Sequence, residues 1–119
     1  MWTALRDEFG LPSLEEVRAR LNDLPDQEPV LRAVVRVFIG DGTFCPGFQF
    51  LPGGQLDPRV TALFETALEA KMPHNYFALW MMTTARELSG HRPVDRLDDT
   101  GRLVRILRAA SGLASVGRR

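Results

Sequence analysis

Apolar residues recur at the spacing of an α-helix over much of the chain, and the first such stripe follows a helix-start signal. The stripe consists of Leu14, Val17 and Leu21. Ser13 precedes it and Glu16 stands three residues later, which is the arrangement of a capping box. The pattern predicts a helix from Leu14 to about Leu21 and then an acidic, proline-bounded loop over residues 22–29.

The next segment is ambiguous between helix and strand. Residues 30–39 place apolar side chains at helical spacing but are also rich in β-branched residues, and we favour a helix that passes into extended chain at Gly40. Beyond it the period changes to two, because Phe48 and Phe50 alternate with their neighbours. The Pro-Gly-Gly sequence at 52–54 offers a tight reversal, so a short hairpin or an extended arm is expected here.

A long amphipathic helix is predicted after residue 56. Asp57 is a suitable N-cap, and Pro58 is suited to the first helical position. An apolar stripe follows at helical spacing, made of Val60, Leu63, Phe64, Ala67 and Leu68. Pro73 places the end of this helix near residues 71–72.

Two more helices are predicted in the last third of the chain. The first spans about residues 75–88, is apolar over most of its circumference, and has Gly90 in position to end it. The second is capped by Asp98 or Asp99 and closed by Gly112. Its inward face carries Leu103, Val104, Ile106 and Leu107.

These elements predict a mainly α fold, a small helical domain of four to five helices with one short hairpin or extended arm. The 119 residues, 45% of them apolar, suffice for one core but not for two full domains. The 15 basic and 15 acidic residues cancel, so the net charge does not call for nucleic acid or an anionic membrane. The charge is polarised: residues 86–119 contain eight arginines and four acidic residues, a net charge of +4, and residues 1–85 therefore carry −4. The basic end is suited to an acidic surface or an anionic pocket.

Catalytic and metal-binding chemistry finds little support in the residue pattern. His74 and His91 are the only histidines, and neither stands at the spacing of a metal-ligand set or a catalytic triad. Glu65 and Glu69 share a helix face but have no histidine motif beside them. We expect no cofactor and no metal, and a small hydrolase or transferase is the least favoured class.

The chain also has the features of a cytoplasmic protein. Cys45 is the only cysteine, which excludes an internal disulfide, and it is expected to be a small buried side chain rather than a reactive thiol. The longest apolar run, Tyr76–Met82, is far shorter than the roughly 20 residues that span a bilayer, and no export signal is readable. We therefore expect no membrane partner.

A family resemblance lies in the structural residues of the C-terminal third. They are Trp80, Leu88, Gly90, Arg92, Pro93, Val94, Asp95, Leu97, Gly101, Val104 and Leu107. This pattern resembles the toxin-binding domain of Xre/MbcA/ParS-type antitoxins. The shared features are a helix with a tryptophan, a turn that runs from leucine through glycine to proline, and a last helix that begins near a glycine. The Phe-Gln-Phe segment at 48–50 resembles the arm before that domain. The resemblance covers about residues 44–110.

The resemblance implies an antitoxin of a type II toxin-antitoxin pair. Such antitoxins bind a RES-type toxin, which consumes NAD, and lay their C-terminal region over its NAD pocket. The implied parts are an N-terminal helical segment at residues 1–43, a toxin-binding domain at 44–112 and a flexible tail at 113–119. Guanidinium groups suit a pyrophosphate site or an acidic catalytic residue, although exposed arginines are also ordinary on a solvated helix face. The predicted toxin-facing arginines are Arg92, Arg102, Arg105 and Arg108, with Arg118 and Arg119 in the tail.

Three residues of the predicted 75–88 helix belong either to the core or to an interface. For Trp80 we favour the core, because a side chain of this size usually anchors a fold. Met81 and Met82 are included among the partner-binding residues, since methionine adapts well to recognition surfaces. Exposed apolar surface on this helix would also favour a homo-oligomer.

The alternative function is a DNA-binding transcriptional regulator that represses its own operon. Many relatives of this kind carry a helix-turn-helix ahead of the toxin-binding domain, and the predicted helices at 14–21 and 30–38 stand at that position. The eight-residue loop between them is longer than the three or four residues of a helix-turn-helix. Residues 14–39 hold four arginines against five acidic residues, so DNA is a possible but weakly supported partner.

Overall fold

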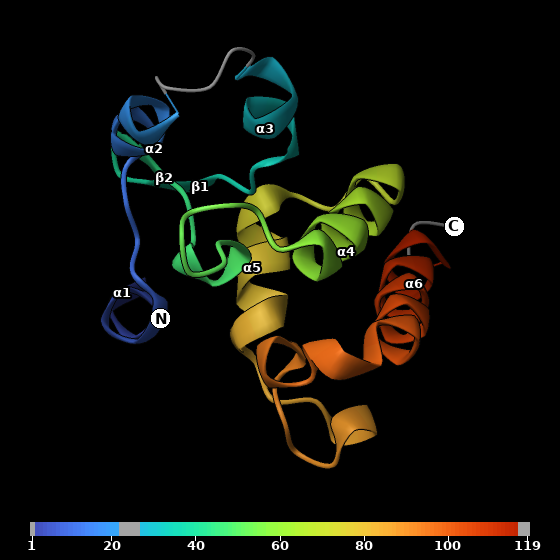
Figure 1. Ribbon diagram of the computed structural model, residues 1–119. Coiled ribbons are helices and arrows are strands. Elements are labelled where there is room, and N and C mark those ends of the chain that lie inside the picture. The colour runs from blue at the N-terminus through green and yellow to red at the C-terminus, as the bar shows by residue number, and fades with distance from the viewer. Residues whose placement is uncertain (1, 22–26, 117–119) are drawn as a thin grey trace. The chain divides into compact units, whose positions relative to one another are not determined.

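The computed structural model describes residues 2–21 and 27–116, the last six of these by their backbone only. The described chain is mainly helical with one two-stranded antiparallel sheet, which confirms the predicted fold class (Figure 1). The chain divides into two compact units, residues 1–61 and 62–119. Their boundary falls inside helix α4, Pro58–Glu69. The predicted division into residues 1–43, 44–112 and 113–119 stays a prediction.

The first unit is built from short elements. Its described elements are α1 (Trp2–Phe9), α2 (Leu14–Arg20), α3 (Glu28–Ala33), β1 (Val37–Ile39), β2 (Gly42–Phe44) and the 3-10 turn η1 (Gly47–Gln49). Helix α2 begins as predicted, because the Ser13 hydroxyl accepts a hydrogen bond from the Glu16 backbone N–H at 3.1 Å. Most of the predicted loop at 22–29 lies outside the described residues.

The region between α3 and η1 differs from the prediction. Helix α3 ends at Ala33, and the segment that was expected to continue it forms β1 instead. The backbone N–H and C=O of Val35 are both bonded to the side chain of Gln49, at 2.7 and 3.1 Å, so they are not available to a helix. The hairpin is therefore made by β1 and β2, ahead of the predicted position, and only the bridge between Phe50 and Leu56 marks the expected reversal.

The core of the first unit gathers around α2. One cluster of this core joins buried Val17, Leu21, Val34 and Cys45, with Leu14, Val30, Leu31, Phe50 and Leu56 packed against them. Helix α1 packs against η1, where the rings of Phe9 and Phe48 meet edge to face at 6.2 Å. Gly47 lies so close to the end of α1 that an added Cβ would fall on the Phe9 carbonyl group.

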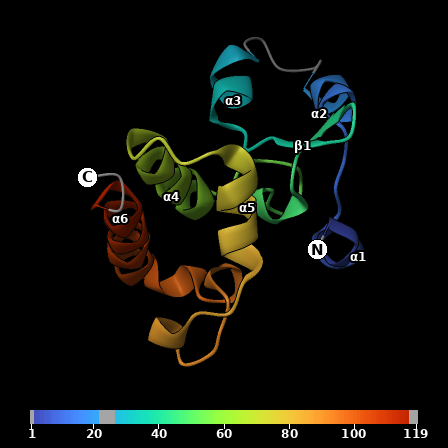
Figure 2. The same cartoon turned by 180° about the vertical axis from the view of Figure 1, so that it is seen from behind.

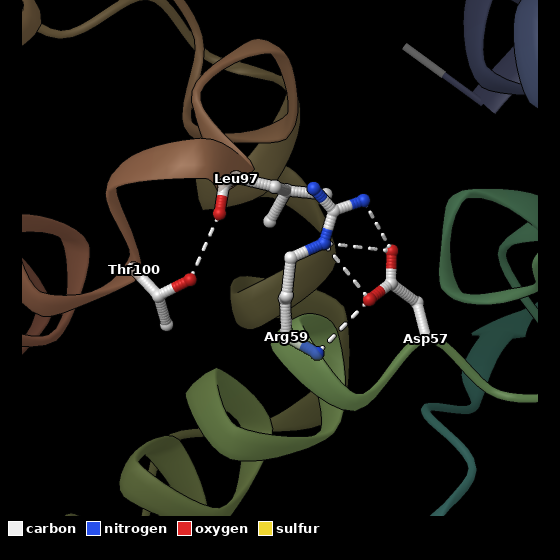
Figure 3. A network of polar contacts seen from close by, with 4 residues as sticks. All are labelled: Asp57, Arg59, Leu97 and Thr100. Atoms are coloured by element: carbon white, nitrogen blue, oxygen red, sulfur yellow. Dashed lines mark hydrogen bonds and ion pairs between the residues drawn. The ribbon is translucent and has the colours of Figure 1, made fainter.

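The predicted start of α4 is confirmed. The Asp57 carboxylate accepts the backbone N–H of Arg59 at 2.9 Å, as an N-cap does, and also binds the Arg59 guanidinium at 2.8 Å (Figure 3). The hydrogen bond from the Arg59 side chain lowers the pKa of Asp57, against the opposing effect of burial. A charged pair thus fixes the first turn of the helix.

The second unit begins with the rest of α4, which ends at Glu69 through a Schellman motif. The Met72 N–H bonds the Ala67 carbonyl at 2.9 Å and the Lys71 N–H bonds the Leu68 carbonyl at 3.0 Å. Lys71 has a φ of 59°, in the left-handed region that a glycine usually fills. Pro73 then precedes α5, His74–Met82.

Helix α5 is shorter than predicted. It ends at Met82 because Thr83 is extended, and the Thr83 hydroxyl donates to the Leu79 carbonyl at 2.6 Å. The chain then passes through the 3-10 turns η2 (Arg86–Leu88), η3 (Pro93–Asp95) and η4 (Leu97–Asp99). Gly90, with a φ of 84°, ends η2 and not a long helix. Figure 2 shows this loop leaving α5 and returning through the short turns to α6.

Helix α6, Thr100–Val116, closes the second unit. The Thr100 hydroxyl donates to the Leu97 carbonyl at 2.8 Å and ties the helix to η4 (Figure 3). Leu103 and Leu107 are fully buried, as the predicted inward face requires. The helix continues through Gly112, which was predicted to end it, because one glycine costs only about 1 kcal/mol in a helix interior.

Candidate partner-binding site

Helix α5 exposes large apolar side chains on a surface without charge. None of its nine residues is Asp, Glu, Lys or Arg. Tyr76 is 54% exposed and Leu79, three residues later on the same helical face, is 43% exposed. Leu68 is exposed to a similar degree, at 44%, but belongs to helix α4 and serves as a comparison outside α5. An apolar, uncharged and exposed helix face is typical of a surface that another protein covers.

The opposite face of α5 belongs to the core. The ring of buried Phe77 lies 5.2 Å from that of Phe64. Trp80 is half-buried, and its ring stacks on Phe77 with the centroids 6.1 Å apart. Met81 is fully buried, so its predicted contact with a partner is corrected to a core role. Met82 is half-buried and keeps some surface for a partner.

Arg92 is largely engaged within the chain. Its guanidinium binds both oxygens of the Asp95 carboxylate, from Nε at 2.7 Å and from Nη2 at 3.1 Å. This fork pairs its charge and leaves the side chain only 23% exposed. Arg92 is therefore a fixed part of the turn that begins η3.

The three arginines of α6 all reach the surface, but they differ in their contacts. The Arg102 guanidinium donates to the Glu87 carbonyl oxygen at 2.5 Å and so joins α6 to η2. The side chains of Arg105 and Arg108 are exposed, and no hydrogen bond or ion pair engages either guanidinium group within the described residues. Arg118 and Arg119 lie outside those residues.

The loop between α5 and η3 is held by its own backbone. Ala85 and His91 form an antiparallel bridge, in which the Ala85 N–H bonds the His91 carbonyl at 3.0 Å. Inside this bridge Ser89 has a φ of 57°, a left-handed conformation that is uncommon for a residue with a side chain. The His91 ring nitrogen Nδ1 lies 2.9 Å from the Leu88 carbonyl. Backbone bonds and Arg102 together give this loop one defined shape.

Groups that often do chemistry have structural roles in the described chain. Cys45 is buried, and desolvation raises the pKa of its thiol to about 11 despite the nearby charge of Arg36, so a thiolate nucleophile is disfavoured. The His74 ring packs edge to face on Phe64 at 4.7 Å. Among residues 2–21 and 27–116, no group of three His, Cys, Asp or Glu side chains is arranged to hold a metal ion.

Comparisons with protein-family models, with curated proteins and with solved structures found no match to this chain. None of the helices in the described part of the chain combines the length and the apolar character needed to cross a membrane. The site is therefore interpreted from its own surface: exposed apolar residues on α5 and the exposed Arg105 and Arg108 on α6.

Proposed function

We propose that this chain is the antitoxin of a type II toxin-antitoxin pair and neutralises a RES-type, NAD-consuming toxin by direct contact. The observation that carries the proposal is the exposure of Tyr76 and Leu79 on a helix without charged residues. The C-terminal sequence pattern, which resembles the toxin-binding domain of Xre/MbcA/ParS-type antitoxins, supports this kind of partner. A role in binding rather than in catalysis follows from the proposal.

The two apolar side chains offer a useful binding free energy. Complete burial of a leucine or an aromatic side chain is worth about 1.5–3 kcal/mol. Tyr76 and Leu79 are each about half exposed, so a partner that covered both would gain about 2 kcal/mol. That corresponds to roughly a 30-fold gain in affinity.

The exposed side of α6 that carries Arg105 and Arg108 supplies the second part of the proposed contact. Exposed guanidinium groups can pair with the carboxylates in the active site of a nucleotide-binding enzyme. They can also occupy the subsite in which the phosphates of the nucleotide bind. In this proposal the last two helices and the tail cover the NAD pocket of the toxin. Substrate is then excluded by occupation of the site, without any chemical step in the antitoxin.

Co-expression with the product of the adjacent open reading frame tests the proposal. We expect that product to arrest growth alone, to be harmless beside this chain, and to co-purify with it. Leu79→Ala should weaken the complex, whereas Leu68→Ala, the same substitution at a similarly exposed site on α4, should have little effect. A non-toxic neighbour, or the absence of a complex, would contradict the proposal. If the chain instead binds the promoter DNA of its own operon, with an affinity that falls steeply as the salt concentration rises, the transcriptional regulator would be favoured.

A further inference from the structure

The four arginines that the sequence groups together fall into two pairs. Arg92 donates two hydrogen bonds to Asp95, and Arg102 donates one to the Glu87 carbonyl. Arg102 also occupies the third position of α6, where a positive charge opposes the helix dipole. Its position is explained by the bond to η2, which holds the loop before the helix.

Arg105 and Arg108 have no such role in the described chain. They stand three residues apart on the exposed side of α6, opposite the buried Leu103 and Leu107. Helix α6 contains no aspartate or glutamate, so neither arginine has a carboxylate three or four residues away on its own helix. Two like charges at this spacing repel each other in the free protein. A partner that supplied negative charge would remove that repulsion.

We propose that Arg105 and Arg108 together bind a pair of carboxylates on the surface of a protein partner. This inference rests on the proposed function and narrows it to two arginines. Side chains three residues apart on a helix have Cβ atoms roughly 5–6 Å apart, so each guanidinium can form a forked pair with its own carboxylate. The contribution of Arg92 and Arg102 is to fix the loop that precedes α6.

A protein fits this surface better than a nucleic acid or a lipid membrane does. The same unit exposes Tyr76 and Leu79, and aromatic and arginine side chains are both enriched in protein interfaces. Although residues 86–119 carry a net charge of +4, residues 1–85 carry −4, which reduces the general attraction to a polyanion on which nucleic-acid binding depends. The two arginines therefore act locally, on individual acidic side chains.

Two double variants with the same loss of charge test the inference. In R105Q/R108Q the free pair is removed, and in R92Q/R102Q the engaged pair is removed. Each is titrated against the product of the adjacent open reading frame and, separately, against labelled poly-L-glutamate as a simple acidic polypeptide. Duplex DNA and phosphatidylglycerol vesicles provide the other two anionic probes.

We expect R105Q/R108Q to weaken binding to both acidic protein probes at least tenfold and to reduce its dependence on salt. R92Q/R102Q should change affinity less than threefold, while the backbone amides of residues 87–91 exchange faster with solvent. Equal losses in the two variants, or no loss in R105Q/R108Q, would overturn the inference. Tighter binding of DNA or vesicles than of poly-L-glutamate, lost in the same variant, would show that the partner is not a protein.

The two proposals fail separately. If the wild-type chain does not bind the product of the adjacent open reading frame, the proposed function is wrong, and the poly-L-glutamate titration still decides the role of Arg105 and Arg108. If the wild-type complex forms but R105Q/R108Q binds as tightly, the antitoxin proposal stands and the assignment of these arginines is wrong.

Discussion

Replacing Gln49 with leucine should strongly destabilise the first unit. Gln49 is buried, and its amide makes three hydrogen bonds to backbone groups. Its oxygen accepts from Val35 N–H at 2.7 Å, and its nitrogen donates to the carbonyls of Val35 and Pro46 at 3.1 and 3.0 Å. Leucine has a similar volume, so the substitution removes these bonds without opening a large cavity.

The magnitude follows from the groups left behind. In Gln49→Leu the N–H and C=O of Val35 lose the partners that they have in the native chain. An unsatisfied buried backbone group costs about 1–3 kcal/mol, and the added apolar surface of leucine offsets a part of this. We expect a net loss of about 2–5 kcal/mol, a large share of the 5–15 kcal/mol by which a domain is usually stable.

Urea unfolding followed by circular dichroism and by tryptophan fluorescence measures this loss. Trp2 lies in the first unit and Trp80 in the second, so variants that keep one tryptophan each report on one unit. The matched control is Gln55→Leu, the same substitution at an exposed glutamine, which should change stability by less than about 0.5 kcal/mol. A loss below about 1 kcal/mol for Gln49→Leu, or an equal loss in the control, would refute the argument.

Three further predictions concern single positions. Gly47→Ala should cost about 3 kcal/mol or more in urea unfolding, because its Cβ would meet the carbonyl of Phe9; an unchanged midpoint would contradict this contact. Lys71→Gly should stabilise the chain by about 0.5–1 kcal/mol, since its left-handed φ of 59° strains a side chain; destabilisation would show that Lys71 makes a needed contact. The lowered pKa of Asp57 means that its pair with Arg59 stabilises the fold above the unfolded pKa of about 3.9 and is lost as pH falls through the folded pKa. Stability should therefore fall less between pH 5 and pH 2 in Asp57→Asn than in the wild type, and parallel pH curves would contradict this.

Local signals in the sequence predicted where helices begin. Ser13 and Asp57 cap α2 and α4 through hydrogen bonds to backbone groups two or three residues away, so the spacing alone was sufficient. The early end of α3 depends on Gln49, which bonds Val35 from a position 14 residues after it in the chain. No local pattern shows that contact, and alternation with two phenylalanines made Gln49 resemble an outward residue of a strand.

Helix ends were harder to predict because their local signals were weak or ambiguous. The end of α5 at Met82 had a weak signal, the pair Thr83 and Thr84, whose β-branched side chains disfavour a helix. Gly90 is a stronger signal and predicts that α5 ends there, but in the structure it follows the 3-10 turn η2. For the candidate site, the sequence predicted the exposed arginines of α6 but not the carbonyl that Arg102 binds.

Inhibition of NAD consumption tests the central claim most directly. The product of the adjacent open reading frame is assayed for NAD consumption while this chain is added in increasing amounts. We predict that consumption falls to background at saturation, and that Leu79→Ala requires more of the chain for the same inhibition while Leu68→Ala does not. NAD consumption that continues unchanged beside a saturating amount of the wild-type chain would contradict the account.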